Sequence, residues 1–176
     1  MTQMGCAKKP VAGFTLIELL AGLSIATLLL ALALPQWASW LAEQRVSVVA
    51  SRLLSGLARA RVEAIQRGLP VRLCAAAQND CATRSEWSSG WHSQSGHAQG
   101  WQTLRVSEPP PNGVRVEVMA TVLQPGVVFE SRGFAMQAAG GFASGSWVVC
   151  ARGARQRTIT LAPSGRARLS TGAPCS

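Results

Sequence analysis

The N-terminal part of the chain contains one long and almost purely apolar segment. It runs from Phe14 to Leu34, and its 21 residues include only four polar ones, Thr15, Glu18, Ser24 and Thr27. A helix of that length rises roughly 30 Å, which is the thickness of the hydrocarbon core of a bilayer. The pattern therefore predicts a single membrane-spanning helix over residues 14–34.

A second helical pattern follows this segment. Between Trp37 and Gln66 the apolar residues recur at spacings of three and four, the period of one helix face. These residues are Val46, Val49, Leu53, Leu57, Ala60 and Ala64. Arginines at positions 45, 52 and 59 recur every seven residues on another face, which indicates a solvated face. The pattern predicts an amphipathic helix over residues 35–67 that continues into the globular part.

Proline and glycine mark the limits of this second helical segment. Pro35 removes a helix hydrogen bond, so it bends the helix or marks a boundary where the two segments meet. Gly68 and Pro70 favour an end of the helix just before them, because glycine suits the C-cap and proline cannot continue the helix. Residues 68–176 are expected to form a domain of their own.

The pattern changes to short β-type runs after Pro70. The expected strands are Val71–Ala75, Trp101–Val106, Val114–Val122, Val127–Glu130, Ser146–Ala151, Thr158–Leu161 and Ala167–Ser170, with turn-rich stretches between them. The polar, Gly/Ser-rich stretch Ser85–Gly100 is interpreted as a long loop. An antiparallel sheet that packs on the second half of the helix is expected, which gives an α+β fold class.

Charge is unevenly distributed along the chain. The formal net charge is +9, from 17 Lys plus Arg against 8 Asp plus Glu, and the only lysines are Lys8 and Lys9. From Arg132 to Ser176 there are six arginines and no acidic residue. A basic excess of this kind favours an anionic partner such as nucleic acid or lipid headgroups, although an arginine-rich genome gives the same bias without function.

Two arginine groups in this C-terminal segment are candidate DNA-binding residues. One consists of Arg152, Arg155 and Arg157, around the turn after Cys150. The other is Arg166 and Arg168, which alternate and would share one face of a strand, next to Gly165, where the backbone can turn tightly. Such arrays suit contacts to the phosphates of double-stranded DNA, which give affinity without sequence preference. Solvated strand faces are the equally weighted alternative.

Five cysteines occur, and the first of them, Cys6, precedes the apolar segment. Removal of a leader that contains Cys6 leaves an even number, which suits disulfides in an oxidising compartment. Cys74 and Cys81 enclose a short loop, and Cys150 and Cys175 lie where a bridge ties the C-terminal tail to a strand. These two bridges are therefore favoured over the two other sets of pairings.

Catalytic and metal chemistry are not indicated by the residue pattern. The acidic residues after Glu18 are scattered singly, no Cys-x-x-Cys occurs, and His92 and His97 lack acidic or thiol neighbours at ligand spacing. We therefore expect neither an enzyme nor a bound metal or cofactor. Trp87, Trp91, Trp101 and Trp147 are candidates for base stacking, but burial is the commoner fate of tryptophan.

The charges that flank the apolar segment predict its orientation. Lys8 and Lys9 precede the segment, and positive charge favours the cytoplasmic side, so the C-terminal domain is expected outside, in the periplasm, with the helix in the inner membrane. A cleaved secretory signal is the alternative, but the run is long for that and ends in no small-x-small cleavage pattern. Cys6 stands on the wrong side of the segment for a lipoprotein signal.

The stretch Gly13-Phe14-Thr15-Leu16-Ile17-Glu18-Leu19-Leu20 closely resembles the cleavage and methylation site of type IV prepilins. The resemblance implies that a prepilin peptidase cuts between Gly13 and Phe14, removes residues 1–13 as a leader, and methylates Phe14. It also implies that Glu18 pairs with the N-terminal amine of a neighbouring subunit during assembly. A carboxylate within an apolar helix costs roughly 3 kcal/mol, so a partner is expected on physical grounds as well.

The C-terminal domain resembles the minor pilins and pseudopilins of the FimT and GspH type. The residues that carry the likeness are Trp87–Trp91, Val127–Phe129 with Gly133, Trp147–Cys150 and Ser164–Arg168. Gly165-Arg166-Ala167-Arg168 also resembles the Gly-Arg-x-Arg motif of FimT-like pilins that bind DNA in natural transformation. The stretch His92–His97 departs from the aliphatic strand and acidic turn that are frequent in the family, which leaves the strand order there open.

Two functions are compatible with this sequence. One is a minor pilin of a type IV pilus that binds DNA non-specifically during natural transformation. The other is a structural minor pilin, or a pseudopilin of a type II secretion system, that primes or caps the filament without binding DNA. In both cases the expected partners are other pilin subunits, the prepilin peptidase and the inner membrane.

The prepilin interpretation predicts the N-terminus of the mature chain. Mass spectrometry of the protein from the membrane fraction should find a chain that begins at N-methylated Phe14, because the peptidase cuts after Gly13. Intact residues 1–13 in assembled filaments would contradict the interpretation.

Overall fold

The computed structural model describes residues 15–77, 80–81 and 87–175, except for the side chains of 32–35. Its one long helix, α1, runs from Leu16 to Arg67, and the strands follow it. The chain divides into two compact units between Trp37 and Ala38, and each unit is described by itself. The division of the sequence into residues 1–13, 14–34, 35–67 and 68–176 remains a prediction.

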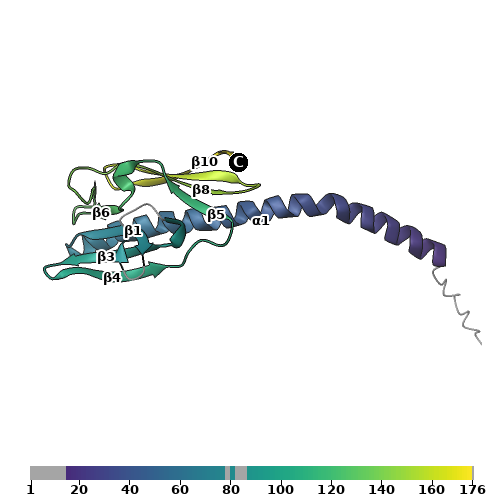
Figure 1. Ribbon diagram of the computed structural model, residues 1–176, viewed down its shortest axis with the longest axis horizontal. Coiled ribbons are helices and arrows are strands. Elements are labelled where there is room, and N and C mark those ends of the chain that lie inside the picture. Colours follow the sequence, from purple (N-terminus) through teal and green to yellow (C-terminus); the bar gives the residue numbers. More distant parts are fainter. Residues whose placement is uncertain (1–14, 78–79, 82–86, 176) are drawn as a thin grey trace, which may run out of the picture. The chain divides into compact units, whose positions relative to one another are not determined.

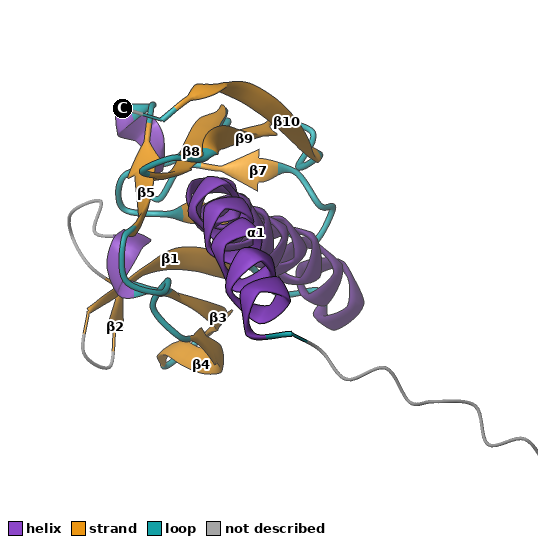
Figure 2. Cartoon of the chain, turned by 90° about the vertical axis from the view of Figure 1, so that its right-hand side faces the viewer, coloured by secondary structure: helices purple, strands orange, loops and turns teal. Residues whose placement is uncertain are grey.

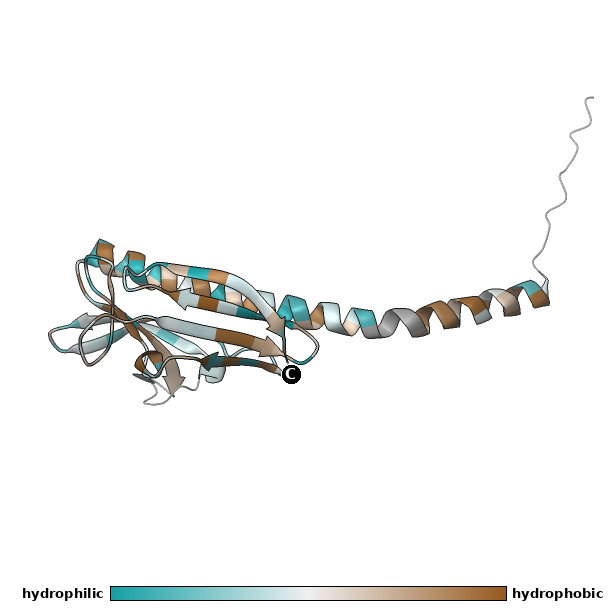
Figure 3. Ribbon diagram, turned by 90° about the horizontal axis from the view of Figure 1, so that it is seen from above, coloured by the Kyte–Doolittle hydropathy of each residue, from teal (hydrophilic) through white to brown (hydrophobic). Residues whose placement is uncertain are grey.

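The first unit contains the apolar part of α1. Within the described residues, α1 is the one helix that is long and apolar enough to cross a membrane, with a mean hydropathy of 2.3 in its most apolar window. Figure 3 shows this part as a nearly continuous hydrophobic ribbon. Its leucines and isoleucines are exposed, for example Leu16 and Leu28. They have no core to pack against within this unit, as expected of a helix that lies in lipid.

The second unit contains two antiparallel sheets. The first sheet has the order β4-β3-β1-β6-β7, with β2 paired to β1. Its strands are β1 (Val71–Ala77), β2 (Asp80–Cys81), β3 (Trp91–His97), β4 (Gly100–Ser107), β6 (Val127–Phe129) and β7 (Ala135–Met136). The second sheet has the order β10-β9-β8-β5. Its strands are β5 (Val114–Val118), β8 (Gly145–Ala151), β9 (Arg155–Leu161) and β10 (Ala167–Pro174).

The second half of α1 lies between the two sheets. Figures 1 and 2 show β1, β3 and β4 on one side of the helix and β5, β8, β9 and β10 on the other. The predicted helical stripe is confirmed, because Val46, Val49, Leu53, Leu57, Ala60 and Ala64 are all buried. They form one core with the inner residues of both sheets. Trp87 from the 3-10 helix η1 (Trp87–Ser89) meets Trp147 of β8 edge-on, with ring centroids 5.3 Å apart.

The predicted ends of several elements need correction. The expected α+β fold of a helix and antiparallel strands is confirmed, but the strands form two sheets where the sequence suggested one. The expected strand Val114–Val122 ends at Val118, and Thr121–Leu123 is the 3-10 helix η2. The expected strand Thr158–Leu161 begins earlier, at Arg155. The helix does end at Arg67, followed by Gly68 with a φ of 65°.

The interpretation of Ser85–Gly100 as a loop is wrong for its described part. Trp91–His97 is the inner strand β3, paired with both β1 and β4. Close packing explains the glycine in this strand: a Cβ at Gly96 would lie 2.9 Å from the Pro70 side chain. Gln94 is only 2% exposed, and its side chain accepts a hydrogen bond from Arg72 of β1 and donates one to Thr103 of β4. A strand buried on both faces has no polar-apolar alternation to reveal it.

The double-sided core predicts different costs for two positions on the same helix. Leu53→Ala should destabilise the protein by about 2–5 kcal/mol, because Leu53 is fully buried and leaves a cavity. Val48→Ala should cost less than about 0.5 kcal/mol, since Val48 is 55% exposed. Urea unfolding of the full chain in mild detergent, followed by tryptophan fluorescence, measures both. Equal effects would contradict the placement of this helix face.

Candidate nucleic-acid interface

Arg166 and Arg168 lie at the tip of the β9–β10 hairpin and point away from the core. In the register of this hairpin Arg168 pairs with Thr160, while Leu169 pairs with the buried Ile159. Paired residues share a face and neighbours alternate, so Arg168 lies on the outer face of the sheet. The carbonyl of Arg166 accepts a hydrogen bond from Ala162 N–H at 3.0 Å, which continues the ladder by one step. Both arginine side chains are exposed.

Gly165 fixes the position of this tip. Its φ is 77°, in the left-handed region, and a Cβ there would stand 2.1 Å from the carbonyl oxygen of Gly133. That carbonyl also accepts a hydrogen bond from Arg61 Nε of α1 at 3.0 Å. Ala135 N–H donates to Pro163 O at 2.9 Å from the same neighbouring loop. The turn that presents Arg166 therefore packs against a loop that is itself bonded to the helix, and only glycine fits at its centre.

The second group of arginines has a different environment. Arg152 is exposed in the turn after β8. Arg157 shares the inner face of β9 with Ile159, and its Nη2 lies 3.7 Å from Glu43 Oε2 on α1. The backbone N–H of Arg155 donates to Glu43 Oε1 at 3.1 Å. Arg157 also donates to Thr171 Oγ1 on β10. This guanidinium binds the helix to the sheet and is not an open surface cation.

The structure therefore separates the two arginine groups that the sequence places in one segment. Arg155 and Leu161 are the two ends of β9, six residue steps apart, a span of about 20 Å along the strand. Arg157 points toward α1, whereas Arg166 and Arg168 point to the opposite face. Between them the outer face of the hairpin carries the hydroxyls of Thr158, Thr160 and Ser170.

One further arginine on this outer face was missed by the sequence analysis. Arg115 of β5 is exposed, pairs with Cys150 across the ladder, and has Glu117 at 4.0 Å. The alternation in Val114–Val118, with every second residue apolar, is the signal that places Arg115 on the outside.

Both disulfides are the pairs favoured from the sequence. Cys74 and Cys81 join β1 to β2 with Cα atoms 5.4 Å apart. Cys150 and Cys175 join β8 to the C-terminal end of β10 with Cα atoms 5.7 Å apart. Cys175 N–H also donates to Ala154 O at 2.8 Å. The second bridge therefore fixes the end of β10 that lies opposite the arginine tip.

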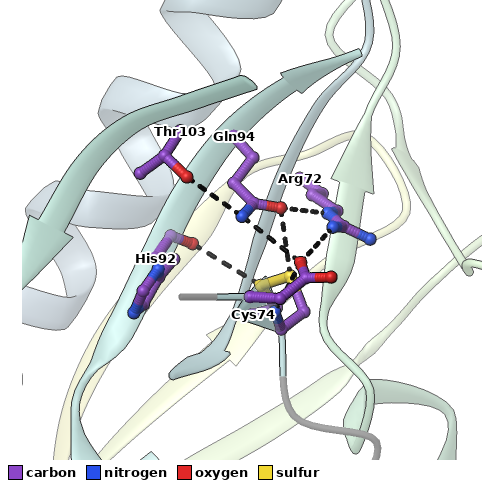
Figure 4. The surroundings of a disulfide bond; sticks show 7 residues. Arg72, Cys74, His92, Gln94 and Thr103 are labelled. Atoms are coloured by element: carbon purple, nitrogen blue, oxygen red, sulfur yellow. Dashed lines mark hydrogen bonds and ion pairs between the residues drawn. A yellow bond between two sulfur atoms is a disulfide. The ribbon is translucent and has the colours of Figure 1, made fainter. Parts of the chain in front are cut away.

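A polar cluster covers the first disulfide on the outer face of the first sheet (Figure 4). Arg72 Nε donates to Gln94 Oε1 at 2.6 Å, and Arg72 Nη2 lies 2.7 Å from Asp80 Oδ1. Gln94 Nε2 in turn donates to Thr103 Oγ1 at 3.2 Å. The backbone N–H of Cys81, which donates to the carboxylate, is the main cause that lowers the pKa of Asp80, and Arg72 adds to it. The cluster satisfies its own charges and holds the β1–β2 hairpin in place.

Three of the four candidate tryptophans are unavailable for base stacking. Trp87 and Trp147 are fully buried and Trp91 is 2% exposed. Trp101 is 40% exposed, and its ring lies under the guanidinium of Arg72 at 4.4 Å. Burial is therefore the main role of these side chains. No cluster of three or more potential metal-ligating side chains occurs within the described ranges.

The candidate assembly residue Glu18 lies in the first turn of α1. Its backbone N–H donates to Thr15 Oγ1 at 3.3 Å, so Thr15 caps the start of the helix. The Glu18 side chain is exposed, with no ion-pair partner in the part of the chain that the structure covers. The processing residues Gly13 and Phe14 lie outside the described residues.

These features define the chain as a pilin-like subunit: an apolar N-terminal helix whose second half packs against antiparallel sheets. The family model described as "Type II transport protein GspH" matches residues 49–165, and that of the prokaryotic N-terminal methylation motif matches residues 8–34. The chain belongs to the GspH family. A comparison with curated protein sequences gives no significant match.

Solved structures of minor pilins and pseudopilins have the same fold. The type IV minor pilin FimU of Pseudomonas aeruginosa is 18% identical, with 76% of this chain and 95% of that chain covered and a TM-score of 0.58. The minor pseudopilin EpsH of Vibrio cholerae is 14% identical over 72% and 97%, with a TM-score of 0.54. GspH of Escherichia coli is 16% identical over 74% and 91%, with a TM-score of 0.51.

Membership of this family establishes the general role of the chain. It is a minor pilin or pseudopilin that assembles with other pilin subunits and is a substrate of the prepilin peptidase. Its family and structural neighbours are filament subunits and not enzymes.

The contact at Gly165 predicts a specific loss of stability. Gly165→Ala should cost about 1–2 kcal/mol for the left-handed backbone and a further 1–3 kcal/mol, roughly, for the collision with Gly133. Gly153→Ala is the matched control, because Gly153 has a φ of 80° and nothing within 4 Å of its virtual Cβ. Thermal unfolding of the full chain measures both variants. A loss no larger than that of the control would contradict the tight contact.

Proposed function

We propose that this chain is a minor pilin of a type IV pilus that binds DNA non-specifically, as natural transformation requires. The binding residues are Arg166 and Arg168 at the tip of the β9–β10 hairpin. The observation that carries the proposal is their arrangement: both are exposed on the outer face of the sheet, and no carboxylate of the described residues pairs with either.

The chemistry of this face suits a phosphate backbone better than base edges. Arginine presents a planar set of donors that matches phosphate oxygens. The nearby hydroxyls of Thr158, Thr160 and Ser170 add neutral donors on the same face. Contacts to phosphates carry no sequence information, so affinity without sequence preference is expected. Two cations give weak binding from one domain.

The other candidate residues are expected to contribute to DNA binding to different degrees. Gly165 acts by holding the tip, since it contacts Gly133 and contributes no charge. Arg152 and Arg155 add long-range attraction from the far end of the hairpin. Arg157 contributes least, because it already pairs with Glu43.

The N-terminal segment supports the accompanying proposals on location and assembly. We place the apolar part of α1 in the inner membrane and the second unit in the periplasm, because Lys8 and Lys9 precede the apolar segment. Glu18 then lies within the membrane and needs a positive partner. The N-terminal amine of a neighbouring subunit, exposed by cleavage before Phe14, supplies it during filament assembly.

The competing function is that of a structural minor pilin or of a pseudopilin of a type II secretion system. Solved relatives of both kinds, FimU and EpsH, fit the fold about equally, with TM-scores of 0.58 and 0.54. In that case Arg166 and Arg168 are solvated residues of a strand face. The distinction rests on DNA binding alone.

The DNA-binding proposal predicts a salt-sensitive interaction that depends on the hairpin tip. The full chain in nonionic detergent should bind unrelated duplexes with similar affinity in a gel-shift assay. With two phosphate contacts, binding should weaken about tenfold between 50 and 200 mM salt. Arg166→Gln with Arg168→Gln should weaken it at least about tenfold at low salt.

The matched control removes the same charge elsewhere. Arg59→Gln with Arg105→Gln also removes two exposed arginines, but from the opposite side of α1. This control should retain DNA binding within about twofold, and circular dichroism should show that both variants fold. If wild type shows no salt-sensitive binding, the structural function takes its place. If both variants lose DNA binding equally, the assignment of the binding site to the hairpin tip is wrong.

A further inference from the structure

A groove of about 400 Å³ lies between α1 and the β3–β4 hairpin, inside the second unit. Leu104 and Val106 line it with accessible apolar surface, and Leu73 and Trp91, which are almost fully buried, form its floor. Gly56 of α1 faces this floor, and a Cβ there would already lie 3.2 Å from Trp91 Nε1. The absence of a side chain at Gly56 therefore keeps the groove open above the tryptophan.

The rim of the groove is strongly basic. Arg52, Arg59 and Arg67 project from α1 and Arg105 from β4, while Glu63 is the one carboxylate among the lining residues. Glu63 pairs with Arg67, so four arginines and one glutamate leave a net charge of +3 along the rim. Arg52 also donates from Nη1 to the Glu108 carbonyl at 3.4 Å and closes one end. Arginines at positions 52 and 59 thus belong to a groove and are not simply a solvated helix face.

One wall of the groove is a strand with an unpaired edge. β4 is the last strand of its sheet, so within the described residues its outer edge has no partner strand. The β3–β4 register shifts between Ser93 and Gln94, and this bulge brings Leu104 and Arg105 to the groove side together. The backbone N–H and C=O groups along this unpaired edge are polar groups that an extended backbone can bind.

We propose that this groove binds an extended segment of another filament subunit in which apolar and acidic side chains alternate. The apolar side chains pack on Leu104 and Val106, and the carboxylates bind the rim arginines. From Arg52 to Arg67 the helix rises about 22 Å, which accommodates about seven extended residues. This mode of recognition, in which an extended segment lies beside an open sheet edge, obtains affinity from the backbone and specificity from alternate side chains.

The floor argues against nucleic acid as the occupant. Base stacking needs an open aromatic face, and Trp91 is only 2% exposed. A phosphate backbone would match the rim but would leave the apolar side chains of Leu104 and Val106 uncovered. The groove shares no residue with the proposed DNA site, so the two proposals stand or fall independently.

Peptide probes test the proposal on the full chain in nanodiscs of zwitterionic lipid, with empty nanodiscs as blank. The probe is a fluorescein-labelled peptide of about seven residues that alternates leucine and glutamate, measured by fluorescence anisotropy. It should bind at least about tenfold more tightly than peptides that alternate leucine with lysine or serine with glutamate. Equal binding of the three peptides, or no binding of the first, would overturn the proposal.

Two variants locate the binding in the groove. Arg59→Gln with Arg105→Gln removes rim charge, and Gly56→Leu fills the space above Trp91; each should weaken the leucine–glutamate peptide at least about tenfold. Arg166→Gln with Arg168→Gln is the control and should change this affinity less than about twofold. Near-UV circular dichroism checks folding. Unchanged peptide affinity in both groove variants would contradict the proposal. Loss of duplex or single-stranded DNA binding in the Arg59→Gln, Arg105→Gln variant would also contradict it, because the groove would then be a nucleic-acid site.

Discussion

The second half of α1 is buried by a sheet on each of two opposite sides, and this determines which faces of the two sheets are exposed to solvent. Most surface helices have a single apolar stripe, but the second half of α1 contacts two sheets and places Leu53 and Leu57 in a shared core. Each sheet therefore has an inner face on the helix and an outer face toward solvent. Polar residues at the flanks of the stripe complete the arrangement: Glu43 and Arg61 bind the second sheet and its neighbouring loop. The hairpin tip belongs to the second sheet and the basic groove to the first, so the two surfaces lie on different sides of α1.

Much of this fold follows from local patterns in the sequence. The helical stripe, its end before Gly68 and most of the strands are visible because their causes are local: periodicity, glycine and β-branched residues. Strand β3 was not predictable in this way. Gly96 has no side chain because it meets Pro70, and Gln94 is tolerated because it forms hydrogen bonds with Arg72 and Thr103. Whether the strands form one sheet or two depends on contacts between residues that are distant in sequence. The alternation of polar and apolar residues within a single strand does not encode these contacts.

The arginines illustrate how register decides the role of a residue. Arg155 and Arg157 have the same i, i+2 spacing as Arg166 and Arg168, and both pairs flank the same hairpin. The turn through Gly165 sets the register, and the register puts Arg157 opposite Thr171 on the inner face and Arg168 opposite Thr160 on the outer. Spacing alone cannot distinguish these cases, because a shift by one residue exchanges the two faces. The candidate DNA contact is therefore smaller than the sequence suggested, and its position is more definite.

The disulfide between Cys150 and Cys175 has a mechanical consequence. A pull on the hairpin tip acts on β9 and β10 in the same direction along their length, so the hydrogen bonds between β9 and β8 share the load in shear. β10 pairs with β9, and from a free far end it could peel away from β9 one hydrogen bond at a time, at much lower force. The covalent link at that end, where Cys175 is joined to β8, blocks peeling. A load applied at the tip is thus carried into β8 at the centre of the sheet, as tension on a filament subunit requires.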